Sequence, residues 1–258
     1  MFPINKRFYF GQLQSCFARI YAAVHYFVSD LHLFSARSNA AQYEDAFNER
    51  AATGSTFVLG GDIFDFDWST FPSPEATTNA AIDWLHRFVT AHPDCQFHYL
   101  LGNHDCLPAF VNRLDELSAS LSNLAWEPFY LRIGDVLMLH GDVANRHMDA
   151  AGLIAARATK NEPRCRPAYH HQLYSLAVKA RLHKAISVAI NPKRLVARRI
   201  LSYLESVGHG VESGITDVYF GHTHVPMRQY CYQGVLFHNG GAAMPGLKFQ
   251  ILEVNLSK

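Results

Sequence analysis

Five short apolar segments of this chain each end abruptly in a cluster of polar residues. Their apolar residues are largely β-branched or aromatic, which is typical of buried strands that end in polar loops. The five segments are residues 24–29, 56–59, 97–101, 136–139 and 218–220. Because amphipathic stretches separate several of them, the pattern predicts crossover units in an α/β sheet. Ligands of such sheets bind at the carboxyl ends of the strands, which is where all five polar clusters fall.

Helices are expected between the first strands, and further strands near the C-terminus. Apolar residues recur at i, i+3 and i+4 spacing in three stretches, residues 40–52, 76–91 and 107–121. Three later segments are β-like: residues 227–232, 234–238 and 249–254. They predict a β-meander that completes a second sheet. The expected fold class is therefore α/β, or α+β in some schemes.

The composition predicts one folded domain over residues 1–258. Hydrophobic residues make up 49% and charged residues 17% of the chain, which excludes the signature of disorder. No apolar run reaches the roughly 18 residues that a membrane-spanning helix needs. The five cysteines are widely spaced and form no C-x-x-C pair, which favours a reducing, cytoplasmic compartment. Polar residues interrupt the apolar ones in residues 1–23, so we interpret this segment as an N-terminal extension and not as a signal peptide.

Residues 143–213 are interpreted as an insertion with its own charge. The spacing between polar clusters is 32, 41 and 37 residues before this segment and 82 across it. The net charge of the chain is +1, yet this segment holds twelve Lys and Arg against four Asp and Glu. The rest of the chain is therefore acidic. Helical periodicity at residues 173–190 and 193–207 predicts a basic helical lid.

The polar clusters supply side chains that bind metal ions. They are Asp30-x-His32, Gly61-Asp62-x-x-Asp65, Gly102-Asn103-His104-Asp105, His140-Gly141-Asp142 and His222-x-His224. Oxygen and imidazole donors without a thiolate suit manganese, iron, zinc or magnesium. One such motif alone is more often an ordinary histidine at a strand end, but five at strand ends disfavour coincidence. The donors are too many for one open site and suffice for two ions that share a bridging carboxylate.

In this order, the motifs D-x-H, G-D-x-x-D, G-N-H-D/E, H and G-H-x-H resemble those of the calcineurin-like metallophosphoesterases. The resemblance spans about residues 27–224 and implies a four-layer sandwich of two β-sheets flanked by helices, with two divalent ions at one edge. It implies that Asp30, His32 and His224 bind one ion. It assigns the other ion to Asn103, His140 and His222, with Asp62 as the bridge. Manganese is the expected metal, and such a pair activates water for in-line attack on phosphorus.

The same resemblance implies that His104 donates a proton to the leaving group and that Asp65 orients it. A carboxylate on one imidazole nitrogen fixes the tautomer and favours the protonated ring. Asp105 is a second candidate for the orienting role because it follows His104 directly. For Asp105 and Asp142, however, loop capping through Asx-turns is the favoured interpretation.

The substrate has to be inferred from features outside the metal motifs, because one metal centre serves many phosphoesters. The stretch Gly61–Phe66 and the basic insertion after His140 resemble the UDP-diacylglucosamine pyrophosphatases of lipid A synthesis, in which the insertion forms a lid for acyl chains. The best-known branch of that group has Arg where His104 stands. We therefore expect hydrolysis of a phosphoester or pyrophosphate bond in a small or lipid-linked substrate such as UDP-diacylglucosamine. The alternatives are a general phosphodiesterase or phosphomonoesterase and a non-catalytic binding scaffold.

The basic insertion offers a surface for anions. Arg194, Arg198 and Arg199 are expected to bind an anionic phosphate-containing substrate, or the anionic inner face of a membrane as a peripheral contact. A solvated helical face is the alternative. Nucleic acid is disfavoured as a partner because the sequence has no basic strand face interleaved with aromatic residues.

Overall fold

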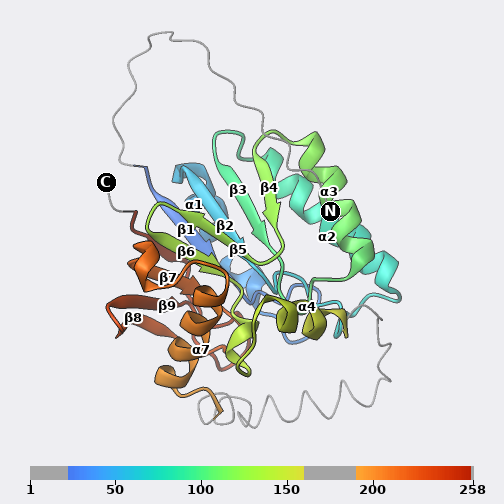
Figure 1. Cartoon of the computed structure of the whole chain (residues 1–258). Helices are drawn as coiled ribbons and strands as arrows, with labels where there is room; N and C mark the ends of the chain where they lie inside the picture. The colour runs from blue at the N-terminus through green and yellow to red at the C-terminus, as the bar shows by residue number, and fades with distance from the viewer. Residues whose placement is uncertain (1–22, 160–189, 257–258) are drawn as a thin grey trace, which may run out of the picture.

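The computed structural model describes residues 23–159 and 190–256. Its strands form two five-stranded sheets (Figure 1). The first has the order β10-β1-β2-β3-β4 and consists of β1 (His25–Val28), β2 (Thr56–Gly60), β3 (Gln96–Leu100), β4 (Leu124–Glu127) and β10 (Leu252–Val254). Strands β1 to β4 are parallel, and β10 pairs antiparallel with β1. The parallel strands therefore end at one common edge.

The second sheet also has a parallel centre. Its order is β5-β6-β7-β9-β8, with β5 (Tyr130–Ile133), β6 (Val136–Leu139), β7 (Asp217–Phe220), β8 (Met227–Tyr232) and β9 (Val235–Asn239). Strands β6, β7 and β9 run parallel, while β5 and β8 pair antiparallel at the two edges. The carboxyl ends of β6 and β7 consequently lie side by side.

Helices cover the outer faces of the two sheets (Figure 1). The helical segments are η1 (Ala40–Tyr43), α1 (Glu44–Thr53), α2 (Pro74–Thr90), α3 (Pro108–Ser120), η2 (Asp142–Ala144), α4 (Ala150–Ala158), α7 (Lys193–Ser206) and η3 (Val211–Ser213). Helix α2 begins sharply because the Ser73 hydroxyl accepts from the Ala76 amide and Pro74 opens the first turn. Asp149 caps α4 in the same way through the Gly152 amide.

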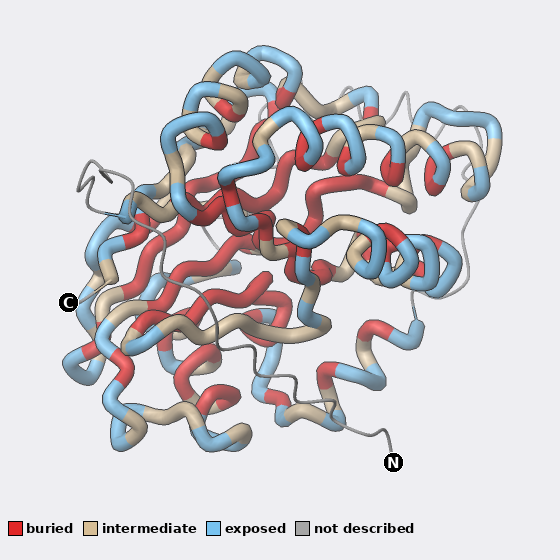
Figure 2. Tube along the Cα trace, turned by 90° about the horizontal axis from the view of Figure 1, so that it is seen from above, coloured by how far each residue is buried: buried red, intermediate tan, exposed pale blue. Residues whose placement is uncertain are grey.

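Three apolar clusters fill the three interfaces between four layers. Phe57 and Leu85 belong to the cluster between the first sheet and its helices. Val58 and Tyr219 belong to the cluster between the two sheets. Ile200 of α7 packs in the third cluster, against the second sheet. Adjacent residues of β2 face opposite layers, as strand geometry requires, and Figure 2 shows the strands as buried segments inside the outer helices. The predicted four-layer sandwich is confirmed.

The C-terminal strand corrects one prediction. Residues 249–254 were expected in the second sheet, but β10 spans Leu252–Val254 and pairs with β1 of the first sheet. Its residues pair with His25–Phe27 of β1, and this pairing places Val254 in the cluster between the sheets. The helix expected over 193–207 is α7. The helix expected over 173–190 lies, apart from Ile190, outside the described residues, as does the extension 1–23 apart from Ala23.

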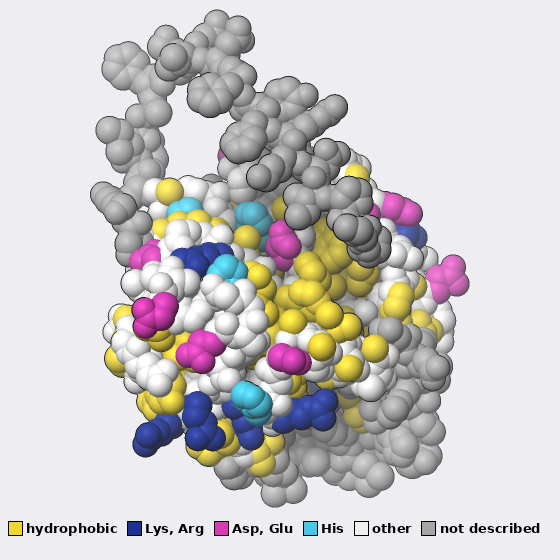
Figure 3. All heavy atoms as spheres, in the orientation of Figure 1, with side chains coloured by type: hydrophobic (Ala, Val, Ile, Leu, Met, Phe, Trp, Pro, Cys, Tyr) yellow, Lys and Arg dark blue, Asp and Glu magenta, His cyan; other side chains and the backbone are white. Residues whose placement is uncertain are grey.

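The described surface carries a basic region on α7. Lys and Arg side chains gather along the lower edge of Figure 3, where α7 lies. Arg194 and Arg198 are exposed positions of this helix. Within residues 23–159 and 190–256, no helix combines the length and hydropathy needed to cross a membrane.

Candidate metal centre

The structure brings the polar clusters at the ends of β1, β2, β3, β6 and β7 together. Potential ligand atoms of Asp30, His32 and His224 lie within 4.8 Å of one another. Those of Asp62, His140 and His222 form a second group, in which the ligand atoms also lie within 4.8 Å of one another. The first group has the same members as one ligand set implied by the sequence motifs. The second joins the implied ligands His140 and His222 to the implied bridge Asp62. The function of these residues as ligands stays a prediction.

In the first group, two imidazole nitrogens and a carboxylate converge. His32 Nε2 lies 3.2 Å from His224 Nε2, and His224 Nε2 lies 3.4 Å from Asp30 Oδ1. The Asp30 carboxylate accepts hydrogen bonds from the Ser29 hydroxyl at 2.7 Å and from the His222 amide at 2.9 Å. The Asp30 carboxylate is thus held in place by two groups, the Ser29 hydroxyl and the His222 amide, that are not themselves candidate metal-binding atoms.

In the second group, His140 is the central side chain. Its Nε2 atom lies 3.3 Å from Asp62 Oδ2 and 3.2 Å from Asn103 Oδ1. The other oxygen of Asp62 accepts from the His104 amide at 2.8 Å. The two groups adjoin, because the His32 amide donates to the Asp62 carbonyl at 3.0 Å.

The backbone at these residues is unusual. Asp30, His32, Asp62, His222 and His224 all have φ between 47° and 65°. Residues other than glycine pay roughly 1–2 kcal/mol to enter this left-handed region. Five strained residues gathered at one edge of the fold indicate a functional constraint on where their side chains point.

Two glycines allow this close packing. A Cβ atom at Gly102 would overlap the Asp62 carboxylate, and one at Gly221 would overlap the Asp30 carboxylate and the Ser29 hydroxyl. Because the overlap involves fixed, buried groups, neither position accepts a side chain without displacing a predicted ligand.

Burial and charge shape the protonation of the centre. Burial disfavours the charged form of Asp62, but the nearby His140 and His104 outweigh it and hold the pKa of the carboxyl well below its usual range. Burial opposes protonation of His140 as well, yet Asp62 and Asp30 raise its pKa to about 10. Burial and the neighbouring His140 lower the pKa of His222 to about 4. Burial opposes ionisation of Asp30 too, but the hydrogen bond and charge of His224 and the charge of His140 lower its pKa. Asp30 and Asp62 are therefore two buried carboxylates that need positive charge beside them.

The donor set fits divalent cations. Carboxylate, amide and imidazole donors suit manganese, iron, zinc and magnesium, and the described residues of the centre include no thiolate. The compensating charge that Asp30 and Asp62 require is what cations at the two convergence points would provide.

His104 and Asp65 form a pair beside the metal ligands. His104 Nδ1 lies 3.0 Å from Asp65 Oδ1, and His104 is part of a third group with Asp65 and His32. Burial lowers the pKa of His104, but the charges of Asp65 and Asp62 outweigh it and raise the pKa to about 9. The His104 side chain is 20% exposed, and its role as a proton donor oriented by Asp65 stays a prediction.

Arg37 supports Asp65 and was not expected from the sequence. One of its guanidinium nitrogens lies 3.5 Å from Asp65 Oδ2, and the guanidinium stacks 4.4 Å from the centre of the Trp68 ring. The Trp68 amide also donates to Asp65 at 3.0 Å. Arg37 belongs to none of the sequence motifs. It lies in an irregular segment, seven residues before the start of α1.

Asp105 accepts hydrogen bonds both from its own loop and from outside it. Its carboxylate accepts from the Ile63 amide at 2.9 Å, from the Tyr99 hydroxyl at 2.6 Å and from the Gly102 amide. Burial and the charge of Asp62 raise the pKa of Asp105 to about 6. Asp105 therefore ties the loop after β2 to the loop after β3.

Asp142 forms a buried ion pair. Arg157 of α4 donates to its two oxygens at 2.8 and 2.9 Å. Arg157 also donates to the Pro128 carbonyl. The pair anchors α4 next to the centre, a role that local sequence patterns do not reveal because 15 residues separate the partners.

Asn145 is a further residue that the motifs missed. Its side-chain oxygen lies 2.8 Å from His222 Nε2. Arg199 of α7 donates to the Ala144 and Asn145 carbonyls at 2.8 and 2.9 Å. Of the three arginines expected to bind substrate, Arg199 thus supports the loop that contacts His222, while Arg194 and Arg198 face solvent. Substrate binding by these arginines stays a prediction.

Comparison with known proteins places the chain among metal-dependent hydrolases. A family model described as calcineurin-like phosphoesterase matches residues 26–226. Among solved structures, a dimetal phosphatase from Danio rerio shares 11% identity, with 86% of this chain and 88% of that chain covered and a TM-score of 0.44. No curated protein matches the chain.

Proposed function

The chain belongs to the calcineurin-like phosphoesterase family, and on this basis we propose that it hydrolyses a phosphoester or pyrophosphate bond with two divalent ions held at the ends of β1, β2, β3, β6 and β7. The family makes it a metal-dependent phosphoester hydrolase. The observation that supports the site is the convergence of two buried ligand groups, one around Asp30 and one around Asp62.

The chain's own residues hold and orient the reacting groups in this proposal. Asp30, His32 and His224 would hold one ion. Asn103, His140 and His222 would hold the other, and Asp62 would be shared between the two. Two bound ions would polarise the phosphoryl oxygens and lower the pKa of the attacking water. The neutral Asn103 limits the negative charge that faces an anionic phosphate.

His104 supplies the proton that the leaving group needs. Its Nδ1 atom is held by Asp65 at 3.0 Å, so the proton available for transfer is on Nε2. Because the raised pKa keeps the ring protonated near neutral pH, the imidazolium donates to the departing oxygen as the bond to phosphorus breaks. Arg37 and the Trp68 amide hold Asp65 in the orientation that this requires.

The finer assignments are supported by sequence patterns. We propose manganese as the metal and a small or lipid-linked substrate such as UDP-diacylglucosamine, with a general phosphodiesterase as the alternative. We also propose one catalytic domain with residues 143–213 as a basic insertion. We also propose a reducing, cytoplasmic compartment, with which the free thiols of Cys95, Cys106 and Cys231 are consistent. Helix α7 is the proposed site of peripheral contact with an anionic membrane.

Hydrolysis of bis(p-nitrophenyl) phosphate with and without manganese tests the reaction. We expect manganese-dependent release of p-nitrophenol that Asp62→Asn reduces by at least about 100-fold, because the bridging carboxylate loses its charge. Asp83→Asn is the matched control, since Asp83 is exposed on α2. Equal turnover by Asp62→Asn and the wild type would overturn the two-metal assignment. A panel of monoesters, diesters and nucleotide-sugar pyrophosphates then identifies the substrate class.

A further inference from the structure

Two predicted ligands, one for each ion, lie on the same short loop. His222 and His224 follow β7 and Gly221, with Thr223 between them. Both histidines have a left-handed backbone, with φ of 65° and 56°, which residues other than glycine adopt in only a small minority of cases. Such a conformation persists only where the surrounding structure holds it. The positions of both imidazoles therefore depend on the groups that bond to this loop.

The side chain of Asn239 holds the loop from a neighbouring strand. Asn239 is the last residue of β9, which runs parallel to β7 in the second sheet. Its Nδ2 atom donates to the Gly221 carbonyl at 2.8 Å and to Thr223 Oγ1 at 3.2 Å. One side chain thus bonds to the residue before His222 and to the residue after it.

The orientation of the Asn239 amide is fixed. The backbone N–H of Gly241 donates to Asn239 Oδ1 at 2.8 Å, so the NH₂ group is the end that faces the loop. Asn239 is only 1% exposed. Breaking hydrogen bonds between buried groups is costly, because the groups that lose their partner find no replacement. Asn239 therefore holds the loop in one position.

Asn239 differs from Asp30, which also bonds to the loop. The Asp30 carboxylate accepts from the His222 amide but is itself a predicted ligand. Both polar atoms of Asn239 are engaged by Gly221, Thr223 and Gly241, and the residue lies outside the five sequence motifs. Its contacts suit a group that positions ligands and does not bind an ion.

We propose that Asn239 is a positioning residue for both metal ions, because its contacts with Gly221 and Thr223 set where His222 and His224 lie. The two histidines are assigned to different ions. Loss of Asn239 should therefore weaken both ions together, whereas loss of one histidine removes a ligand from one ion. The inference rests on the proposed function, since it takes both histidines to bind metal.

Manganese binding by the full-length chain tests the proposal. The EPR signal of free manganese gives the number of bound ions and their Kd values, and two ions are expected for the wild type. Asn239→Ala should raise both Kd values by about 10- to 100-fold, the usual effect of losing a group that orients a ligand. Asn239→Asp keeps the shape but turns an oxygen toward the Gly221 carbonyl, and should bind at least as weakly. His224→Ala should weaken one ion far more than the other.

Asn123→Ala is the matched control for a purely structural role. The Asn123 Nδ2 atom lies 3.1 to 3.4 Å from three backbone carbonyls, those of Val89, His92 and Cys95. Asn123 directly precedes β4, so it lies at the sheet edge opposite to the ligands. Its loss should lower the free energy of unfolding and leave both Kd values unchanged. An equal loss of manganese affinity in Asn123→Ala and Asn239→Ala would show general destabilisation and would overturn the inference.

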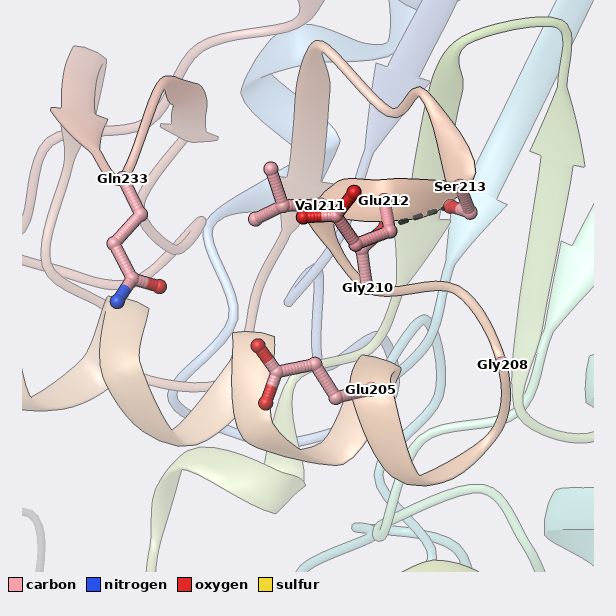
Figure 4. Close-up of a pocket in the computed structure, with 7 residues that line it drawn as sticks. All are labelled: Glu205, Gly208, Gly210, Val211, Glu212, Ser213 and Gln233. Carbon is pink, nitrogen blue, oxygen red and sulfur yellow. Dashed lines mark hydrogen bonds between the residues drawn. The ribbon is translucent and has the colours of Figure 1, made fainter.

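Manganese bound elsewhere on the surface has to be separated from these two ions. Glu205 and Glu212 are exposed and line a hollow at the end of α7 (Figure 4). Carboxylates at a surface attract divalent cations weakly. The titrations are therefore repeated with Glu205→Gln and Glu212→Gln in the same chain. This change should leave the two tightly bound ions and the effect of Asn239→Ala unaltered.

Thr223→Val keeps the test decisive where Asn239→Ala does not fold. It removes one acceptor of the Asn239 amide and keeps the size of the side chain, so both Kd values should rise by about threefold. Unchanged Kd values in the Asn239 variants and in Thr223→Val, with two ions bound by the wild type, would overturn the inference and leave the proposed function standing. A wild type that binds no manganese would instead overturn the proposed function, and the inference with it.

Discussion

His32 Nε2 and His224 Nε2 lie 3.2 Å apart although 192 residues separate them in the chain. Asp30 Oδ1 lies 3.4 Å from the same atom of His224. Three atoms that bind metals with a lone pair therefore face one point inside the fold. A divalent cation at that point satisfies all three at once, which links cation binding to the stability of the folded state.

Manganese is expected to raise the melting temperature of the protein, and a chelator to reverse the rise. A ligand that binds only the folded state stabilises it by about 2.7 kcal/mol when its concentration is 100 times Kd. Differential scanning fluorimetry measures the shift. His224→Ala should lose most of it, whereas His86→Ala, on the exposed face of α2, should retain it. The same shift in His224→Ala would exclude a cation at this point.

His104→Ala is expected to slow poor leaving groups more than good ones. General acid catalysis contributes roughly 10²–10⁴-fold to rate, and a leaving group with a low pKa departs without a proton. A series of aryl and alkyl phosphodiesters measures kcat against the pKa of the leaving group. The slope should be steeper in His104→Ala than in the wild type. A uniform loss across the series would show that His104 has another role.

The strands that carry the ligands could be predicted because each is a continuous apolar run. Thr56–Gly60, for example, is buried at every position, so its sequence shows no polar alternation. Strands β4 and β5 were missed for the opposite reason. Leu124–Glu127 includes exposed and polar residues, and Tyr130–Ile133 is half-buried throughout. Edge strands of this kind resemble loops in sequence, and their pairing depends on neighbours far along the chain.

Some residues of the candidate centre could be predicted from the sequence, and others could not. Asp62 and His140 fall in motifs with fixed spacing at strand ends, so the sequence alone identifies them. Asn145 contacts His222, and Arg157 contacts Asp142, only because the segment that carries η2 and α4 lies beside the loop after β3 (Figure 1). The left-handed backbone at His222 could not be predicted from the sequence either, since residues other than glycine adopt it in only a small minority of cases.

Neutralising the exposed arginines of α7 should weaken binding to anionic vesicles. Each basic residue near such a surface contributes about 1 kcal/mol, so Arg194→Gln with Arg198→Gln should lower the partition coefficient by about 30-fold. Vesicle sedimentation at low and high salt measures it. Arg87→Gln with Arg113→Gln removes the same charge from the exposed faces of α2 and α3 and should have little effect. Binding that is insensitive both to salt and to the α7 substitutions would contradict an electrostatic membrane contact.

Breaking the Asp142–Arg157 pair should destabilise the fold more than replacing both partners. The two side chains are only 7% and 8% exposed, so Arg157→Met leaves a buried carboxylate without its partner and should cost about 3–5 kcal/mol. Asp142→Leu should likewise leave the buried guanidinium of Arg157 without its partner. In the double variant no buried charge is left unpaired, and we expect most of the lost free energy of unfolding to return. Urea denaturation of the four proteins measures this cycle. If the double variant is as unstable as the sum of the single variants, the two side chains act independently, and anchoring of α4 has to be assigned to the Arg157 contact with the Pro128 carbonyl.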